Sequence, residues 1–156
     1  MILVGIGEYA ITDANDECIT THALGSCVAL IIHCEMTRCT AMAHIVLPKQ
    51  DVNHKRIISK EAYFADDIVP KLVNFFTNRP YCKHEHLKIL LVGGAVSPYV
   101  TDVFKVGEKN VHKIKMILDG YGLDYDATEV LGRFSRSVEI QINNGEVMIT
   151  KQEMSI

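Results

Sequence analysis

Two short motifs in this chain supply the residue types that a thiol nucleophile and its base require. Cys27 follows Gly25 and Ser26, and His44 lies one predicted strand later, shortly before Pro48. A thiol is mostly protonated at neutral pH, and it becomes a useful nucleophile when an imidazole lies within hydrogen-bond distance or its pKa is lowered. The small residues before the thiol predict a turn whose backbone N–H groups can stabilise an oxyanion. Either residue alone is more often part of a core, so it is the pairing that predicts chemistry.

A third group usually orients the imidazole of such a pair. Apart from Glu35 at a predicted turn, no carboxylate lies near either motif in the sequence. Thr21 is a candidate, because a threonine hydroxyl or a backbone carbonyl can accept a hydrogen bond from the ring. His22 comes next in the chain, and in a strand it faces opposite to Thr21, so only one of the two points at the site.

Another group of residues has the composition of a metal site. Cys82, His84 and His86 alternate with other residues, and in a strand they would share one face. The segment follows Pro80 and is rich in lysine and glutamate, which favours a solvated loop over a zinc site. The run at 93–95 lacks the spacing of a phosphate-binding fingerprint, and a close backbone approach near the site is its expected role. We therefore expect no metal and no organic cofactor.

Composition limits the partners and the compartment. The 156 residues have the length of one domain, and 48% hydrophobic residues suffice for one core. A net charge of −3 without a basic run argues against nucleic acid. The apolar runs are too short to cross a bilayer and the N-terminus lacks a basic region, so we expect neither membrane insertion nor a secretion signal. Five cysteines, an odd number without a C-x-x-C pair, predict a reducing cytoplasm.

The hydrophobic pattern predicts many strands and two substantial helices in one domain, residues 1–156. Strands are expected over 4–10, 18–23, 28–33, 39–47, 87–92 and 125–131, followed by a hairpin that turns at 143–145. Helices are expected over 59–78, capped by Ser59 and kinked or broken at Pro70, and over 110–118. The strand at 28–33 reads as buried on both faces. Strands at both ends with helices between them favour an α+β fold.

The two motifs, at 24–28 and 42–48, closely resemble those of the chemoreceptor glutamine deamidase family, CheD. The resemblance covers nearly the whole chain, with further matches at 4–9, 93–95 and 107–110, at Arg136 and at the hairpin that follows it. It departs at 96–98 and at 131–132, where the sequence differs from the usual family pattern. These departures concern loop shape and substrate preference and leave Cys27 and His44 in place.

The resemblance implies an enzyme that deamidates glutamines of methyl-accepting chemoreceptors to glutamate, and some members also hydrolyse glutamate methyl esters. It assigns Cys27 as nucleophile, His44 as base and Thr21 as the third member, with Gly25 and Ser26 beside the oxyanion and substrate. Two resting states are possible. Either the pair is neutral and His44 takes the thiol proton during the attack, or the two residues already form an ion pair of thiolate and imidazolium. The implied fold is a mixed-sheet sandwich like that of the cytotoxic necrotizing factor deamidases.

The resemblance also implies a protein partner, a CheC-type phosphatase of the chemotaxis response regulator. One alternative is therefore a binding module that chiefly stimulates this phosphatase, with weak or secondary catalysis. Another is a cysteine hydrolase that acts on a different amide. For the deamidase we expect a shallow groove, which Tyr99, Phe104 and the loop 49–56 could line.

Overall fold

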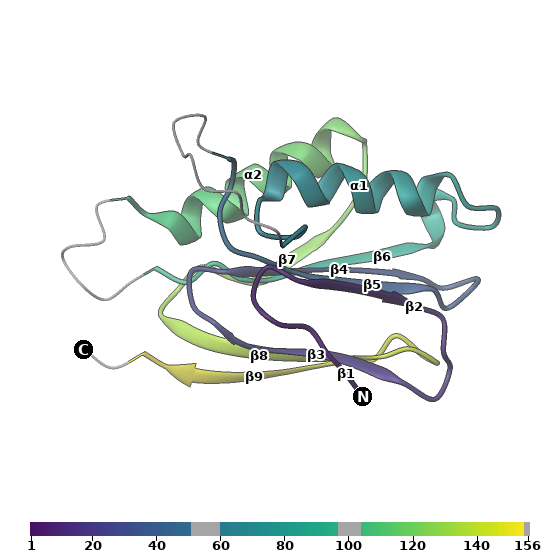
Figure 1. Ribbon diagram of the computed structural model, residues 1–156, viewed down its shortest axis with the longest axis horizontal. Helices are drawn as coiled ribbons and strands as arrows, with labels where there is room; N and C mark the ends of the chain where they lie inside the picture. The colour runs from purple at the N-terminus through teal and green to yellow at the C-terminus, as the bar shows by residue number, and fades with distance from the viewer. Residues whose placement is uncertain (51–59, 97–103, 155–156) are drawn as a thin grey trace.

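The computed structural model of the protein describes residues 1–50, 60–96 and 104–154, and it shows three layers (Figure 1). Two helices, α1 (Ala65–Thr77) and α2 (Val106–Gly120), cover one face of a five-stranded sheet. A four-stranded sheet packs against the other face of that sheet. The prediction of an α+β fold with two helices and mixed sheets is confirmed.

The five-stranded sheet lies in the middle of the structure. Its strands, in spatial order, are β2 (Tyr9–Thr12), β5 (Thr40–Ile45), β4 (Val28–Cys34), β6 (Leu87–Gly93) and β7 (Asp126–Val130). All neighbours are antiparallel except β6 and β7, which are parallel. Every residue of the central strand β4 is buried, because alternate side chains face the helices and the second sheet. The prediction of a strand buried on both faces is confirmed.

The four-stranded sheet has β3 and β8 at its centre. Its order is β1 (Ile2–Leu3), β3 (Cys18–Leu24), β8 (Phe134–Gln141) and β9 (Val147–Glu153), with only β1 and β3 parallel. The predicted hairpin is confirmed, since β8 and β9 are antiparallel and the Gly145 N–H donates to the Gln141 carbonyl. The inner face of this sheet packs on β4 and β5 through a separate apolar core.

The predicted strand over 4–10 is wrong. The chain forms β1, turns at residues 5–8, and then forms β2, which belongs to the other sheet. The turn is closed by a hydrogen bond from the Glu8 N–H to the Gly5 carbonyl, and Gly7 has a φ of +74°, a conformation that glycine adopts freely. The N-terminal segment therefore joins the two sheets.

The first helix is shorter than predicted. It begins at Ala65 after Phe64, and Ser59, the expected cap, lies outside the described residues. Pro70 lies inside the helix without breaking it, so the expected break is wrong. A short 3₁₀ helix, η1 (His84–His86), precedes β6. Among the helices of the described residues, none is long and apolar enough to span a membrane.

Candidate active site

The turn that carries the thiol is held against the segment that follows β6. The Gly25 carbonyl accepts a hydrogen bond from the Ala95 N–H at 2.8 Å, and the Cys27 carbonyl accepts one from the Gly94 N–H at 2.8 Å. A Cβ atom at Gly93 would collide with the Cys27 carbonyl oxygen. The prediction that this glycine-rich run makes a close backbone approach near the thiol is confirmed.

His44 and Cys27 lie on the same face of the five-stranded sheet. Ala29 of β4 pairs with His44 of β5, and Cys27 precedes Ala29 by two residues, which places all three on one face. This face packs against the four-stranded sheet, where Cys27 contacts the core that contains Ala29 and Met42. Diagonal neighbours on paired strands are about 7–8 Å apart at the backbone, a distance that side chains can bridge. The thiol and the imidazole therefore belong to the same end of one layer.

A threonine hydroxyl fixes the hydrogen on the His44 ring. Thr21 Oγ1 lies 2.7 Å from His44 Nδ1 and donates its hydrogen to the Val4 carbonyl, also at 2.7 Å. A hydroxyl has a single hydrogen, so Thr21 accepts the hydrogen bond from the ring. Nδ1 therefore carries the ring hydrogen and Nε2 keeps its lone pair. Nε2 is buried and has no hydrogen-bond partner in the part of the chain that the structure describes. His44 is held in the tautomer that can accept a proton at Nε2.

Burial favours the neutral form of both groups. It lowers the pKa of His44 from its usual value, and the Lys60 ammonium lowers it further. Burial also raises the pKa of the Cys27 thiol, and the hydrogen bond from the backbone N–H of Cys27 only partly opposes this. At neutral pH these shifts favour a neutral thiol and imidazole over a thiolate–imidazolium pair. Of the two resting states considered above, they support proton transfer during the attack.

We expect the reactivity of Cys27 toward iodoacetamide to rise with pH, with an apparent pKa above the value of about 8.5 for a free thiol. Iodoacetamide reacts with the thiolate, and a raised pKa means that fewer thiolates are present at neutral pH in the folded protein. Peptide mass spectrometry after timed alkylation measures the rate at this one cysteine. Cys27 of the same chain unfolded in urea is the control, because its pKa is ordinary there. A plateau of high reactivity below pH 7 would contradict the neutral pair.

The role of the Thr21 hydroxyl can be tested by Thr21→Val, which keeps the shape of the side chain. The substitution removes the acceptor at His44 Nδ1, so the ring is no longer held in one tautomer, and we expect catalysis to fall by about 10- to 100-fold. Ammonia release from a glutamine substrate measures the rate. The substitution removes two buried hydrogen bonds, to His44 Nδ1 and to the Val4 carbonyl, so the free energy of unfolding should fall by about 2 kcal/mol, and the rate is scaled to the folded fraction.

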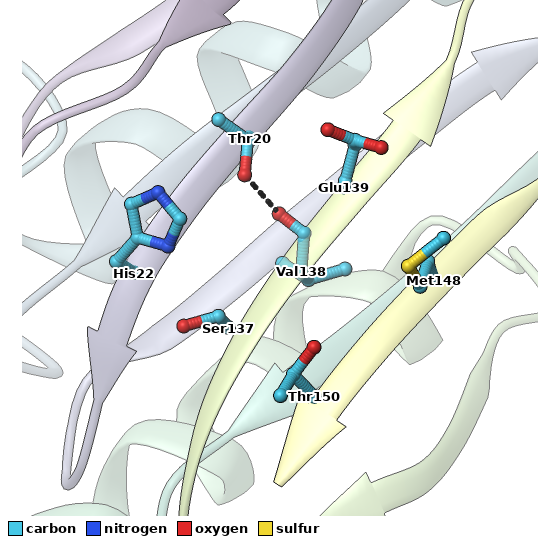
Figure 2. Close-up of a pocket in the computed structure, with 7 residues that line it drawn as sticks. All are labelled: Thr20, His22, Ser137, Val138, Glu139, Met148 and Thr150. Carbon is cyan, nitrogen blue, oxygen red and sulfur yellow. Dashed lines mark hydrogen bonds between the residues drawn. The ribbon is translucent and has the colours of Figure 1, made fainter.

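Thr20 provides the matched control for Thr21. Its hydroxyl is also buried, and it donates to the Val138 carbonyl at 3.0 Å between β3 and β8 (Figure 2). Thr20 comes directly before Thr21 in the strand, so its side chain points to the opposite face from the one that meets His44. Thr20→Val removes one buried hydrogen bond, so it should lose about 1 kcal/mol of stability and keep the wild-type rate. Equal rates for the two valine variants would contradict the orienting role of Thr21.

The outer face of the four-stranded sheet carries a shallow hollow of about 130 Å³ (Figure 2). Side chains of β3, β8 and β9 line it: Thr20, His22, Ser137, Val138, Glu139, Met148 and Thr150. His22 is exposed here whereas Thr21 is buried on the opposite face. The prediction that only one of these two neighbours faces the site is confirmed, and it is Thr21.

A larger hollow of about 660 Å³ lies beside α2, and it is lined in part by Lys49, Lys109 and Lys113. Lys49 belongs to the loop 49–56 that we expected beside the substrate. Tyr99 and residues 51–56 lie outside the described residues, and the Phe104 side chain is exposed. The composition of the substrate groove therefore stays a prediction.

The cysteine and histidine cluster that we considered as a metal site, and for which we favoured a solvated loop, does not form a strand. His84 and His86 lie in the 3₁₀ helix η1 and not in a strand, so the alternation that would align them with Cys82 is absent. Cys82 is buried, and its thiol faces that of Cys34 at 2.8 Å. Within residues 1–50, 60–96 and 104–154, no group of three or more histidine, cysteine or acidic side chains is arranged to hold a metal.

Two buried polar residues near the site were not identified as site residues from the sequence. Asn110 of α2 donates two hydrogen bonds, at 2.9 Å each, to the carbonyls of Ser26 and Val46. Arg136 of β8 contacts the Gly93 carbonyl at 3.4 Å and forms an ion pair with Glu129 at 3.5 Å. Both lie in motifs that carried the family resemblance, but the pattern did not say what they contact. The structure thus brings Thr21 and His44 together by a hydrogen bond and places the thiol of Cys27 on the same face of the layered α+β fold.

Comparison with known proteins gives a consistent result. Residues 46–151 match the family model described as CheD chemotactic sensory transduction. The chemoreceptor glutamine deamidase CheD of Thermotoga maritima is 34% identical over 149 residues, which cover 96% of this chain and 90% of that protein. A probable chemoreceptor glutamine deamidase CheD of Syntrophotalea carbinolica is 29% identical over 150 residues, covering 96% of this chain and 93% of its own. The chain belongs to the CheD family.

Proposed function

We propose that this protein deamidates selected glutamine side chains of methyl-accepting chemoreceptors to glutamate and releases ammonia. The substrate class comes from the family, whose similar members are named chemoreceptor glutamine deamidases. The observation that carries the chemistry is the unprotonated Nε2 of His44, which has no hydrogen-bond partner among the described residues and which Thr21 orients on the sheet face that Cys27 shares.

The first half of the proposed reaction forms a thioester. His44 Nε2 takes the Cys27 proton while the sulfur attacks the carboxamide carbon of the glutamine. Backbone N–H groups at Ser26 and Cys27 stabilise the oxyanion of the tetrahedral intermediate, with Gly25 leaving room for the substrate. The intermediate collapses, the C–N bond breaks, and His44 returns its proton to the departing nitrogen, which leaves as ammonia.

The second half of the reaction releases glutamate. Water gives a proton to His44 Nε2 and attacks the thioester carbon, and the C–S bond then breaks. The proton on His44 returns to the sulfur of Cys27, which restores the thiol. Apart from the attacking water, every group that reacts in these two half-reactions belongs to the protein or to the glutamine substrate. A glutamate methyl ester would react at the same site with methanol as the leaving group, which we propose as a secondary activity.

Several further properties are part of this proposal. We infer that residues 1–156 form one deamidase domain with the fold of the cytotoxic necrotizing factor deamidases, and that it works in the cytoplasm. The five cysteines are all free, which suits a reducing compartment. Binding to a CheC-type phosphatase follows from the family resemblance alone and stays a prediction.

The proposal is tested by mass spectrometry of a chemoreceptor cytoplasmic fragment from the same organism. The fragment is incubated with and without the protein, and each glutamine is followed for conversion to glutamate. We expect conversion at a few defined positions, with an equal amount of ammonia released. No conversion would contradict the proposed function, and a pull-down with a CheC-type protein would then test the partner role.

A further inference from the structure

Asn110 is a fully buried polar residue on the inner face of α2. Its neighbours on that face are Gly107, Val111, Ile114 and Leu118. Burying an amide in such surroundings is unfavourable unless hydrogen bonds compensate for the lost water. Both hydrogens of its Nδ2 are used, and both reach carbonyl groups far away in the sequence, whereas its Oδ1 has no hydrogen-bond partner among the described residues. The role of this buried amide therefore follows from the two carbonyl groups that it binds.

The two carbonyls belong to the two motifs of the site. One is that of Ser26, the residue before the thiol, and the other is that of Val46, two residues after His44. The ladder between β4 and β5 has its last pair at Val28 and Ile45. Beyond that pair, the Asn110 amide joins the two segments in place of a further ladder bond. One side chain therefore holds the turn at residues 25–27, which we call the nucleophile turn, beside the end of β5, the strand that carries His44.

The start of α2 is packed too closely to shift away from this contact. A Cβ atom at Gly107 would collide with the carbonyl oxygen of Ala95, and one at Gly94 would collide with Val111. Gly94 and Ala95 are the residues whose N–H groups hold the carbonyls of the nucleophile turn. The helix, the glycine-rich segment and the turn thus form one packed unit.

The contact at Ser26 also determines where the next N–H group points. A trans peptide unit is planar, so its carbonyl and its N–H point in opposite directions, and no cis peptide bond occurs in the described chain. Because Asn110 draws the Ser26 carbonyl toward α2, the Cys27 N–H is directed away from α2, toward the layer in which the thiol lies. This N–H interacts with its own thiolate and acts to lower the pKa of Cys27 against the effect of burial.

We propose that Asn110 is a positioning residue of the deamidase, which aligns the Cys27 N–H with the oxyanion by holding the Ser26–Cys27 peptide plane. The proposal rests on the function proposed above. A positioning role predicts different effects on thioester formation and on alkylation of the thiol, whereas a purely structural role predicts the same effect on both. Thioester formation needs the oxyanion donor, whereas alkylation of the thiol by iodoacetamide forms no oxyanion and needs only the thiolate.

The test compares Asn110→Asp, Asn110→Ala and Ile114→Ala with the wild type. Asn110→Asp keeps the side-chain shape and replaces the double donor by acceptors. Ile114 lies one turn further along the same buried face, so its truncation disturbs the packing of α2 without touching the two carbonyls. Each variant is measured for the kcat of deamidation, the alkylation rate of Cys27 and thermal unfolding, with both rates scaled to the folded fraction.

For both Asn110 variants we expect kcat to fall by about 10²-fold, the effect of losing one oxyanion donor, while the alkylation rate of the fully ionised thiol, read at the high-pH plateau, changes by less than about threefold. Ile114→Ala should lower the unfolding temperature and keep kcat near the wild-type value. Asn110 variants with the kcat of Ile114→Ala would overturn the positioning role, as would a parallel loss of kcat and alkylation. Unfolding of both Asn110 variants where Ile114→Ala stays folded would also overturn it. Absence of turnover in the wild type would instead overturn the proposed function, and the positioning role with it.

Discussion

Cys27→Ala is expected to lower the rate of receptor glutamine deamidation by at least about 10³-fold, because it removes the sulfur that we propose forms the thioester. The His44 imidazole would remain in its oriented tautomer, so the loss reports the nucleophile and not the base. The thiol is only half-buried, and truncating it should lower the free energy of unfolding by about 1 kcal/mol or less. Site-resolved mass spectrometry of the receptor fragment and thermal unfolding measure the two quantities.

Cys18→Ala is the matched control for this experiment. Cys18 is also free and half-buried, but its thiol donates to Glu139 at 3.6 Å, between β3 and β8. This variant should deamidate the receptor glutamines at the wild-type rate. A Cys27→Ala protein that works within tenfold of Cys18→Ala would exclude Cys27 as the nucleophile. If it kept only the ability to bind a CheC-type phosphatase, the two functions would be separable.

Gly93→Ala should cause a large loss of stability. The φ of Gly93 is +116°, which alanine adopts only with strain, and the new Cβ would collide with the Cys27 carbonyl. Together these effects should lower the free energy of unfolding by about 3 kcal/mol. For a chain of this size, the unfolding temperature would fall by about 6–12 °C. Activity should fall further than the folded fraction does, because the displaced carbonyl belongs to Cys27, the proposed nucleophile.

Gly25→Ala gives the comparison within the same turn. A Cβ atom at Gly25 would have no neighbour within 4 Å, and its φ is not in the left-handed region. The free energy of unfolding should therefore change by no more than about 0.5 kcal/mol. Differential scanning calorimetry measures the unfolding temperatures of the Gly93→Ala and Gly25→Ala variants. Equal unfolding temperatures would show that the turn relaxes around Gly93, and the close approach would then be unimportant for stability.

Sequence reasoning predicted the central part of the fold better than its beginning. The continuous apolar run at 28–33 has one physical meaning, a strand buried on both faces, and β4 is such a strand. The run at 4–10 has a strand-like composition, but the chain changes sheets there. A change of sheet depends on which partner each half finds, β3 for β1 and β5 for β2. That choice is tertiary, so local pattern could not predict it.

In the candidate site, too, residues in short motifs could be predicted from the sequence, whereas residues defined by contacts between distant segments could not. Cys27 and His44 are recognisable because each lies in a short motif whose chemistry needs those residue types. Thr21 could be named only as a candidate, since its contact with His44 joins two different sheets. Asn110 could not be assigned at all, because its partners lie 84 and 64 residues away in the chain. The residues proposed to perform the chemistry could be named from the sequence, whereas those proposed to hold them in place became visible only in the fold.

The hydrogen bond from Thr21 ends on the main chain at Val4, and this has an evolutionary consequence. Every amino acid presents the same carbonyl, so the proton on His44 does not depend on which apolar side chain fills the core at position 4, provided that β1 keeps its place beside β3. Sequence alignments will therefore undervalue the N-terminal strand. Shortening the chain by a few residues at this end would damage the chemistry more than many substitutions within it.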